Sequence, residues 1–267
     1  MSAAMRIVSL HRYPLKGFSA ERLTRVVLGA GGHFPADRKF AVENGPSGFD
    51  PSRPEHQPKI RFLMLMKNDE LARLVTRYDD ASDTLAIVHE GQEVVSANLG
   101  TADGCDAVVR FLASYVPAES RRGLLRVLTA PDGFRFTDSR SGAVSLINLA
   151  SVRDLEARIG APVDPLRFRG NILVEGLEPW QEFTLVGQTF ETSGGVRLAI
   201  SKPIDRCAAT AVDPQTGLRD LAIVRTLMSA YGHVDCGVYA SITRSGVLSE
   251  GQRLMPVNED EPMRLGL

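Results

Sequence analysis

Cys207 is the residue whose surroundings favour chemistry most clearly. Arg206 precedes it directly, and Lys202 lies five residues earlier, followed by Pro203. Cationic neighbours favour the thiolate, which is the form of cysteine that attacks electrophiles and binds metals. A thiolate suits a soft or borderline metal better than it suits Mg²⁺ or Ca²⁺. The alternative is an inert buried cysteine, as free cysteines often are, and the local charge alone leaves the two interpretations evenly balanced.

An arginine pair in the segment 164–176 is the second feature of chemical interest. Arg167 and Arg169 alternate at a period of two, so on a β-strand their side chains would share one face. Two guanidiniums on one face suit a phosphate or another planar anion. The other interpretation is a solvated strand face, which the residues by themselves favour.

The rest of the sequence argues against several kinds of chemistry. It contains no Gly-x-Ser-x-Gly elbow, no Gly-x-x-x-x-Gly-Lys-[Ser/Thr] phosphate loop and no His-Glu-x-x-His pair. The five histidines lack metal-ligand spacing. Cys105 lies on an apolar helical face and Cys236 in a β-prone run, so we expect both to pack in the core.

Composition and charge are those of a globular protein without a long-range field. Of the 267 residues 43% are hydrophobic and 24% charged, and the formal net charge is -1, so nothing recruits nucleic acid or an anionic membrane. No apolar run approaches the roughly 20 residues of a membrane-spanning helix, and the N-terminus does not resemble a signal peptide. Three dispersed cysteines are too few for a disulfide framework. We therefore expect a reduced, cytoplasmic protein with no membrane or nucleic-acid partner.

Short strands, broken by Gly, Pro, Asn and Asp, must position most of these side chains. The strands expected from β-branched and apolar runs are 6–11, 23–28, 38–43, 62–66, 71–77, 84–89, 168–174, 183–190, 236–242 and 251–256. The polar residues 79–83 predict a hairpin turn. Helical periodicity predicts three helices: 101–116, a helix capped by Asn148 and stopped by Gly160, and 219–231 with Leu221, Val224, Leu227 and Met228 inward.

Strands at this spacing favour a mainly β protein with a few helices, of the β-barrel or α+β type. The polar stretch 117–123 follows the first expected helix and marks a boundary. We expect a smaller N-terminal β-barrel domain over residues 1–118 and a second β-barrel domain over residues 119–267.

Four segments, taken in order, resemble those of one family, the MOSC domain with its N-terminal β-barrel domain. Residues 202–207 and 212–217 resemble the MOSC cysteine motif, and residues 167–172 resemble the family's Arg-Phe-Arg-Pro-Asn-Ile segment. Residues 13–17 are similar to the Tyr-Pro-Val-Lys opening of the preceding barrel domain, and residues 37–42 to its Asp-Arg-x-[Phe/Trp] strand. The resemblance covers nearly the whole chain.

This resemblance implies the fold and site of molybdenum cofactor sulfurase C-terminal domains and of the amidoxime-reducing component. In that family the equivalent of Cys207 is a ligand of the metal in the molybdenum-pterin cofactor (molybdopterin). Asp205 and Arg206 would line the metal pocket, and with Cys207 they are the expected catalytic residues. The expected cofactor-binding residues are Lys16, Arg38 and Arg169 at the anionic pterin phosphate, Asn171 nearby, and Arg167 and Lys202. Lys and Arg from separate strands can neutralise such a ligand.

Two positions depart from the family's pattern. Ile204 stands where many members have a second cysteine, so a mechanism that needs a cysteine pair is not expected. Gly170 stands where others have proline. The chain also has no cysteine cluster for an iron–sulfur centre, so a reductase would take its electrons from a separate protein.

The resemblance leaves two functions of different classes open. The first is a molybdenum-dependent oxidoreductase that reduces N-hydroxylated compounds. The second is a carrier module that holds the cofactor, or a sulfur atom as a Cys207 persulfide, and passes it to other enzymes. We expect a pyridoxal phosphate-independent protein, which favours the reductase because a carrier would then need an external sulfur donor. A family member that binds no metal is the weakest alternative.

Overall fold

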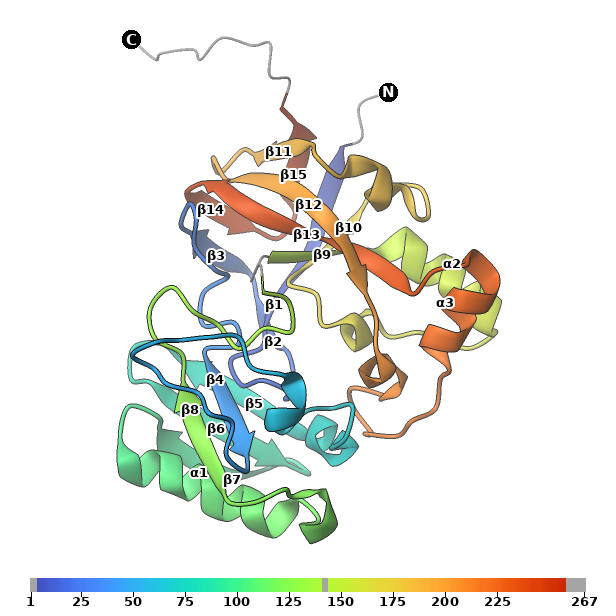
Figure 1. The fold of residues 1–267 in the computed structure, drawn as a ribbon. Helices are drawn as coiled ribbons and strands as arrows, with labels where there is room; N and C mark the ends of the chain where they lie inside the picture. The colour runs from blue at the N-terminus through green and yellow to red at the C-terminus, as the bar shows by residue number, and fades with distance from the viewer. Residues whose placement is uncertain (1–3, 141–143, 258–267) are drawn as a thin grey trace, which may run out of the picture.

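A closed β-barrel forms one end of the protein in the computed structural model, which describes residues 4–140 and 144–257. Within these residues the barrel has seven strands, and hydrogen bonds between β1 and β10 close the ring. It lies at the top of the view in Figure 1. In ring order the strands are β1 (Met5–Arg12), β10 (Ile172–Glu175), β9 (Val144–Asn148), β13 (Asp235–Arg244), β12 (Arg197–Asp205), β11 (Thr189–Thr192) and β15 (Arg253–Pro256).

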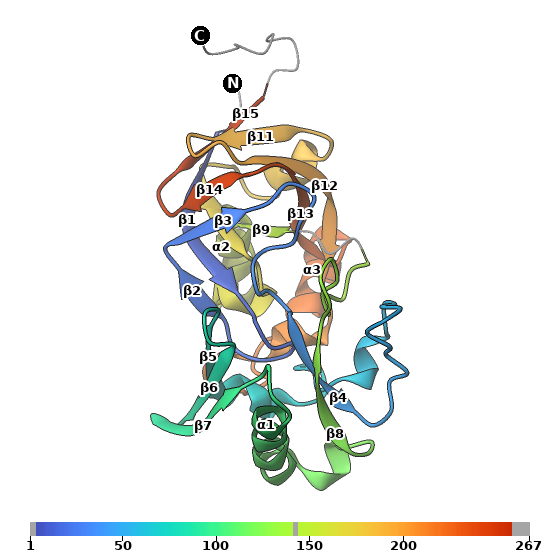
Figure 2. The same cartoon turned by 90° about the vertical axis from the view of Figure 1, so that its left-hand side faces the viewer.

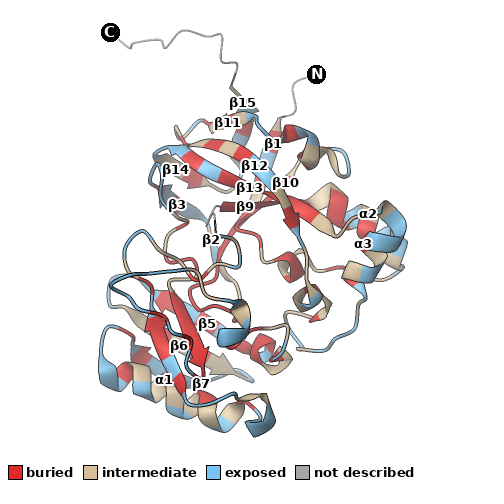
Figure 3. Cartoon of the chain, viewed as in Figure 1, coloured by how far each residue is buried: buried red, intermediate tan, exposed pale blue. Residues whose placement is uncertain are grey.

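The barrel is filled by side chains that alternate along its strands. On β12, Leu198 and Ile200 are buried whereas Arg197 and Ala199 are only partly covered, which is the period of two expected of a strand with one apolar face. Each such buried side chain contributes roughly 1.5–3 kcal/mol. Figure 3 shows the buried residues concentrated on the barrel strands and on the strands below them. β12 and β13 pair over most of their length, so the loop after β12 extends from a firmly held strand end.

The second packing unit lies below the barrel and is built from the N-terminal half. A three-stranded sheet joins β5 (Leu74–Asp79), β6 (Thr84–His89) and β7 (Gln92–Asn98), and a separate ribbon pairs β4 (Phe40–Asn44) with β8 (Leu125–Thr129). The helix α1 (Ala102–Tyr115) packs between them, as Figure 2 shows. Short 3₁₀ helices, η1 (Lys59–Arg61), η2 (Asp69–Arg73) and η3 (Ala118–Ser120), interrupt the connections.

Each packing unit contains strands from both halves of the sequence. β1, from the N-terminus, closes the barrel of the C-terminal half, and β2 (Glu21–Leu23) pairs with its far end. β3 (Arg25–Leu28) pairs with β14 (Gly246–Ser249). The expected domain boundary at residues 118/119 stays a prediction. Each packing unit contains strands from both sides of this boundary.

Two further helices cover one side of the barrel and pack on each other. The side chain of Asn148 caps α2 (Leu149–Ile159), and Gly160 ends it in the left-handed conformation. The prediction of this helix and of α1 is confirmed. The third helix, α3, spans Ile223–Tyr231. It begins later than predicted and buries Ile223 and Leu227, so the prediction of Met228 as an inward residue was wrong: Met228 is exposed.

The mainly β fold with a few helices is confirmed, but several strand predictions were not. Residues 62–66 form no strand, and only an isolated bridge joins Glu43 to Phe62. Residues 69–73 form η2 before β5 begins, and residues 165–168 and 181–185 form the 3₁₀ helices η4 (Pro165–Phe168) and η5 (Gln181–Leu185). The strands β7, β8, β9, β12 and β14 were missed. In β12 the run Ser201-Lys202-Pro203 hides the pattern, and the strand tolerates Pro203 where its register with β13 shifts.

Candidate functional site

A large cavity opens between the two packing units. Its volume is about 670 Å³, which is within the range of small-molecule and cofactor sites. It is lined by all nine site residues that the sequence predicts: Lys16, Arg38, Arg167, Arg169, Asn171, Lys202, Asp205, Arg206 and Cys207. The structure therefore brings the predicted residues together, while the role of each remains a prediction.

Cys207 lies two residues beyond the end of β12, at the start of the short helix η6 (Ala208–Ala211). Its carbonyl oxygen accepts hydrogen bonds from the backbone N–H of Thr210 at 3.1 Å and from the Thr210 hydroxyl at 3.0 Å. Cys207 itself is half-buried and faces the cavity. The β12–β13 pairing and this turn together hold the sulfur at the cavity wall.

Lys59, which the sequence analysis missed, brings a positive charge to Cys207 from the N-terminal half. It lies on η1 and lines the cavity together with Cys207. Burial lowers the pKa of Lys59, but the charges of Cys207 and Asp138 outweigh that effect, so the pKa is raised overall. Nothing in the sequence marks Lys59, because the irregular loop before η1 has no periodicity.

Arg206 is held by backbone carbonyl groups rather than by a carboxylate. Its Nε donates to the carbonyl oxygen of Cys236 at 2.8 Å, its Nη1 donates to that of Phe168 at 2.8 Å, and its Nη2 also donates to Cys236. Burial lowers the pKa of Arg206. Three of the five guanidinium N–H groups are thus used by these carbonyls, and two remain for the cavity.

Arg38 and Arg169 form a cationic pair on the ring of Tyr13. Their guanidinium carbons lie 4.5 and 4.3 Å from the ring centroid, and Arg38 also donates to the carbonyl oxygen of Arg169 at 3.0 Å. Asp37 pairs with Arg38, whereas Arg169 donates through Nη1 to the carbonyl oxygen of Phe18 at 2.6 Å. Burial and the charge of Arg38 lower the pKa of Arg169 to about 10. The buried Nη2 of Arg169 has no acceptor among the described residues.

Lys16 lies in the loop after β1 and lines the same cavity as Arg38 and Arg169. Its ammonium donates to the carbonyl oxygen of Phe136 at 2.9 Å and pairs with Asp138. Burial lowers the pKa of Lys16, although Asp138 opposes the effect. Asp138 also lies 3.9 Å from Lys59, so this carboxylate links the ammonium groups of Lys16 and Lys59.

Arg167 occupies a different environment from Arg169, contrary to the expectation of a shared strand face. It belongs to η4, and the strand β10 begins only at Ile172. Its guanidinium pairs with Asp213 at 2.9 Å and with Asp220 at 2.8 Å, and its side chain is 2% exposed. Arg167 therefore fastens the loop that follows Cys207, and its charge is already neutralised by two carboxylates.

The Asn171 side chain also makes most of its hydrogen bonds within the protein. Its Oδ1 accepts hydrogen bonds from the backbone N–H and the hydroxyl of Ser145, and its Nδ2 donates to the carbonyl oxygen of His11 at 3.2 Å. Asn171 thereby ties β10 to β9 and β1 at the base of the cavity. One Nδ2 hydrogen is left for a ligand.

Lys202 and Asp205 lie at the exposed rim, beside a tyrosine that the sequence analysis missed. The ammonium of Lys202 is 5.6 Å from the ring centroid of Tyr239, and no carboxylate among the described residues lies within ion-pair distance of it. Burial raises the pKa of Tyr239, which lines the cavity. Tyr239 is on β13, so the pairing of β12 with β13 places it near Lys202.

The space beside Gly170 is filled by the side chain of Ile147. A Cβ on Gly170 would lie 2.3 Å from Cγ1 of Ile147, which is fully buried. A Cβ on Gly237 would lie 2.6 Å from Cδ1 of the same side chain. Ile147 therefore fills the space that larger residues at both glycine positions would need.

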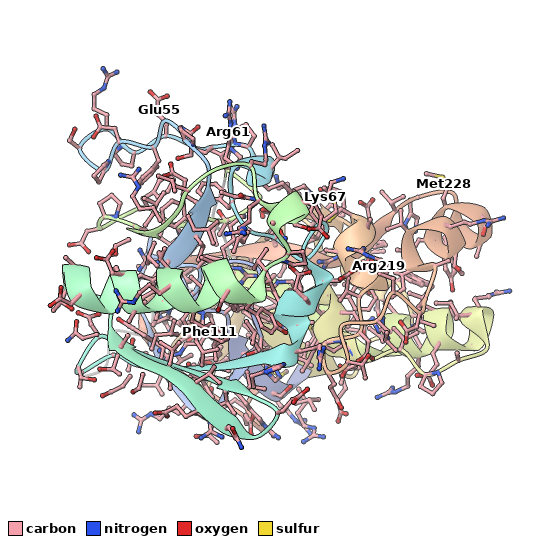
Figure 4. All side chains as sticks on the ribbon, turned by 90° about the horizontal axis from the view of Figure 1, so that it is seen from below. Glu55, Arg61, Lys67, Phe111, Arg219 and Met228 are labelled. Atoms are coloured by element: carbon pink, nitrogen blue, oxygen red, sulfur yellow. The ribbon has the colours of Figure 1, made fainter. Side chains whose placement is uncertain are left out.

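Arg219 connects the loop after Cys207 to the N-terminal half. Its Nε donates to Asp69 at 2.6 Å and its Nη2 donates to the carbonyl oxygens of Leu65 and Met66. In Figure 4 Arg219 lies where the teal segment around η2 meets the orange segment before α3. The wall of the cavity is therefore fixed from both packing units.

Family comparisons agree with this arrangement. The MOSC N-terminal beta barrel domain matches residues 4–119, and the MOSC domain matches residues 133–255. The chain therefore carries a MOSC N-terminal beta barrel domain followed by a MOSC domain. Similar curated proteins are the molybdenum cofactor sulfurases of Caenorhabditis elegans, 28% identical over 83% of this chain, and of Anopheles gambiae, 28% identical over 92% of it. The alignments cover 31% and 37% of those relatives, so the chain spans about a third of their length.

Two solved structures are also similar to this MOSC protein. The YuaD protein from Bacillus subtilis is 12% identical with a TM-score of 0.46, and the match covers 95% of this chain and 96% of that chain. YiiM from Geobacillus stearothermophilus is 22% identical with a TM-score of 0.34, over 43% of this chain and 54% of that chain. Among the described helices, none has the length and apolar character needed to cross a membrane.

Proposed function

We propose that this MOSC protein binds a molybdenum-pterin cofactor in the 670 Å³ cavity, with Cys207 as the metal ligand, and reduces N-hydroxylated compounds. The observation that carries the proposal is the convergence of Cys207 and an excess of cations on one cavity. Arg167 is neutralised by Asp213 and Asp220 from outside the lining, and seven other Lys and Arg residues line the cavity against three Asp residues. A phosphate-bearing, dithiolene-type ligand is anionic, so this lining suits it.

The residues present fit such a group. The buried Nη2 of Arg169 lacks an acceptor, and Arg206 keeps two N–H groups that the carbonyls of Cys236 and Phe168 do not use. Leaving buried donors unpaired costs about 1–3 kcal/mol each, which an anion in the cavity would remove. No three His, Cys, Asp or Glu residues in the described ranges gather as a metal site, so the other ligands of a metal at Cys207 would come from the cofactor.

The residues at different walls of the cavity would have different roles. Lys16, Arg38 and Arg169 would hold the phosphate end, because they come from the loops at the junction of the two units. Cys207, with Lys59 beside it, would present its thiolate to the metal. Lys202, Asp205 and Tyr239 lie at the rim and would meet the substrate.

The cofactor would supply the two-electron chemistry. Overall, R–NHOH takes up two electrons and two protons, the N–O bond breaks, an N–H bond forms, and the oxygen leaves as water. The electrons would come from a separate donor protein. Tyr239 and Lys59 are the titratable groups placed to hold or deliver protons at this end of the cavity.

Molybdenum analysis of protein made in a cofactor-competent host tests this proposal. We expect near-stoichiometric molybdenum in the wild type and a large loss in Cys207→Ala, with N-hydroxy reduction lost in parallel. Cys105→Ala is the matched control, because Cys105 lies on α1, away from the cavity lining. Molybdenum retained in Cys207→Ala would contradict the role of Cys207.

The second candidate is a carrier of the cofactor or of sulfur, and the curated relatives named molybdenum cofactor sulfurase favour it. In that case the Cys207 thiolate would attack the outer sulfur of a donor persulfide, so that Cys207–S–SH forms and the donor thiolate leaves. Protein without molybdenum in which mass spectrometry finds one added sulfur on Cys207 would support the carrier over the reductase.

A further inference from the structure

The ammonium of Lys16 is almost fully buried, and a carboxylate from a distant segment pairs with it. The Lys16 side chain is 9% exposed, and its partner Asp138 comes from the segment after β8. Its second acceptor is the carbonyl oxygen of Phe136, at 2.9 Å. An ammonium group has three N–H donors, so one remains for a group in the cavity. Among the described residues, Asp138 is the only carboxylate within ion-pair distance of Lys16.

Asp138 lies close to a second cation of the cavity as well. Its Oδ2 is 3.9 Å from Nζ of Lys59, and all three residues line the cavity. Burial raises the pKa of Asp138, but the charge of Lys16 and its hydrogen bond outweigh that effect, so the pKa is lowered overall. An anion that approaches these two ammonium groups therefore meets a carboxylate that already binds them, and like charges repel.

The other carboxylate at this end of the cavity is held more firmly. Asp37, which pairs with Arg38, is 7% exposed and also accepts a hydrogen bond from the backbone N–H of Tyr13 at 2.8 Å. The Asp138 carboxylate is 51% exposed. Within the described ranges its only partners at hydrogen-bond or ion-pair distance are the ammonium groups of Lys16 and Lys59. Asp138 is therefore the exchangeable partner and Asp37 the permanent one.

The Asp138 side chain can leave Lys16 while its backbone support stays in place. Phe136, two residues earlier, is buried, and its ring centroid lies 4.9 Å from that of Phe49 and 5.5 Å from that of Phe62. The N–H of Phe136 also donates to the carbonyl oxygen of Arg38 at 3.0 Å. A change of rotamer at the half-exposed Asp138 would turn the carboxylate toward solvent without disturbing this aromatic core.

We propose that Asp138 is an internal counter-anion that competes with the anionic group of the ligand for Lys16 and Lys59. A phosphate-type anion takes over the two ammonium groups as the Asp138 carboxylate turns away. Asp138 thus lowers the affinity of the site for such anions and stabilises the protein when none is bound. That the anion is the phosphate of the pterin cofactor rests on the proposed function, whereas the competition acts on small phosphate-type anions in general.

Isothermal titration calorimetry of the cofactor-free, full-length protein with pyrophosphate tests the competition. We expect Asp138→Asn to bind pyrophosphate about tenfold more tightly than the wild type, because one like charge is removed. Asp138→Glu keeps the charge and should stay within about threefold of the wild type. Asp132→Asn is the matched control, since Asp132 is exposed on the same segment and does not line the cavity. Equal or weaker binding by Asp138→Asn, or no binding by any of these proteins, would overturn the proposal.

Thermal unfolding separates competition from a purely structural ion pair. Without pyrophosphate, Asp138→Asn should unfold at a lower temperature than the wild type, because the buried Lys16 ammonium loses its carboxylate. A ligand of the folded state stabilises it more when it binds more tightly. Added pyrophosphate should therefore raise the midpoint of Asp138→Asn by more than that of the wild type, and an equal or smaller rise would contradict the competition.

Lys16→Met tests whether the carboxylate acts through this lysine. In the Lys16→Met background, Asp138→Asn should gain no more than about threefold in affinity for pyrophosphate, because the contested ammonium is gone. An undiminished gain would refute the role of Lys16 in the competition.

The wild type alone decides the matter if Asp138→Asn fails to fold. With the side-chain carboxyl carbons of aspartate observed by nuclear magnetic resonance, saturation with pyrophosphate should move the Asp138 signal and leave the Asp132 signal in place. A stationary Asp138 signal would refute the exchange of partners.

Molybdenum analysis keeps this proposal separate from the proposed function. If the wild type holds molybdenum but Asp138→Asn binds pyrophosphate no more tightly, the competition is refuted and the proposed function stands. If the wild type holds no molybdenum but Asp138→Asn gains affinity as expected, the proposed function fails and the competition stands.

Discussion

Three cationic side chains near Cys207 are held in different ways, and these contacts decide what each can do. They are those of Arg206, Lys59 and Lys202. Arg206 is fixed by carbonyl groups on β13 and η4. Lys59 comes from the other packing unit and lies close enough to Cys207 for their charges to interact, and Lys202 lies at the rim beside Tyr239. The sequence shows Arg206 and Lys202 as neighbours of Cys207, but their distance along the chain says nothing about these differences.

Gly170 and Ile147 provide a test at the scale of single residues. Gly170→Ala places a Cβ 2.3 Å from Ile147, so we expect a loss of roughly 1–3 kcal/mol of unfolding free energy from overpacking. Ile147→Ala alone should cost about 2–5 kcal/mol through the cavity it leaves. In the double variant the new methyl group enters that space, so the combined loss should be smaller than the sum by about 1 kcal/mol.

Urea denaturation of the four proteins in this cycle measures the coupling. Gly133→Ala and Gly187→Ala are unsuitable controls because both glycines have positive φ. Gly29→Ala is suitable, because a Cβ there meets nothing within 4 Å. Strictly additive losses for Gly170→Ala and Ile147→Ala would contradict the shared-space interpretation.

At the scale of elements, the β4–β8 ribbon depends on a buried carboxylate. Glu43 on β4 faces Arg126 on β8 and accepts hydrogen bonds from Arg126 at 2.9 Å and from the Ser47 N–H at 2.7 Å. Burial raises the pKa of Glu43, but these donors outweigh it and lower the pKa below 4.5. The ribbon therefore holds Glu43 best when it is ionised.

Glu43→Gln should destabilise the protein in a pH-dependent way. Because the folded-state pKa is depressed, the stabilisation by Glu43 is present above its ordinary pKa of 4.5 and is lost as pH falls through the folded-state value. We expect a loss of about 1–2 kcal/mol near pH 7 that shrinks toward pH 3. Denaturation midpoints at both pH values measure it, with the exposed Glu55→Gln as control. A pH-independent difference would show that packing, not charge, is responsible.

At the scale of the whole molecule, the two packing units cannot be separated at the sequence boundary. β1 supplies the strand that closes the barrel between β10 and β15, and β3 pairs with β14. Cutting the chain after residue 118 would leave the barrel with two open edges and a gap in its core. The cavity would also lose Lys16, Arg38 and Lys59.

The fragment 119–267 should therefore fail to fold alone. Unpaired strand edges favour aggregation, so we expect no cooperative unfolding transition by circular dichroism and exposure of apolar surface to dye. Co-expression with a segment of residues 1–118 should restore the transition, because β1 and β3 return. A cooperative transition in the isolated fragment would contradict the dependence on β1.

The family, the mainly β class and the two longer helices could be predicted from the residues alone, because local periodicity, caps and contiguous motifs are written in neighbouring positions. Nine residues of the cavity lining could be predicted too, because they lie in short contiguous motifs. Strands such as β12 could not, because Lys202 and Pro203 interrupt the apolar pattern.

How that set of residues is used depends on the folded chain. Folding neutralises Arg167 with Asp213 and Asp220, occupies most of Asn171 with Ser145 and His11, and brings Lys59 to Cys207. These outcomes depend on desolvation and on partners distant along the chain, because the strength of a charge or hydrogen bond is set by what surrounds it after folding.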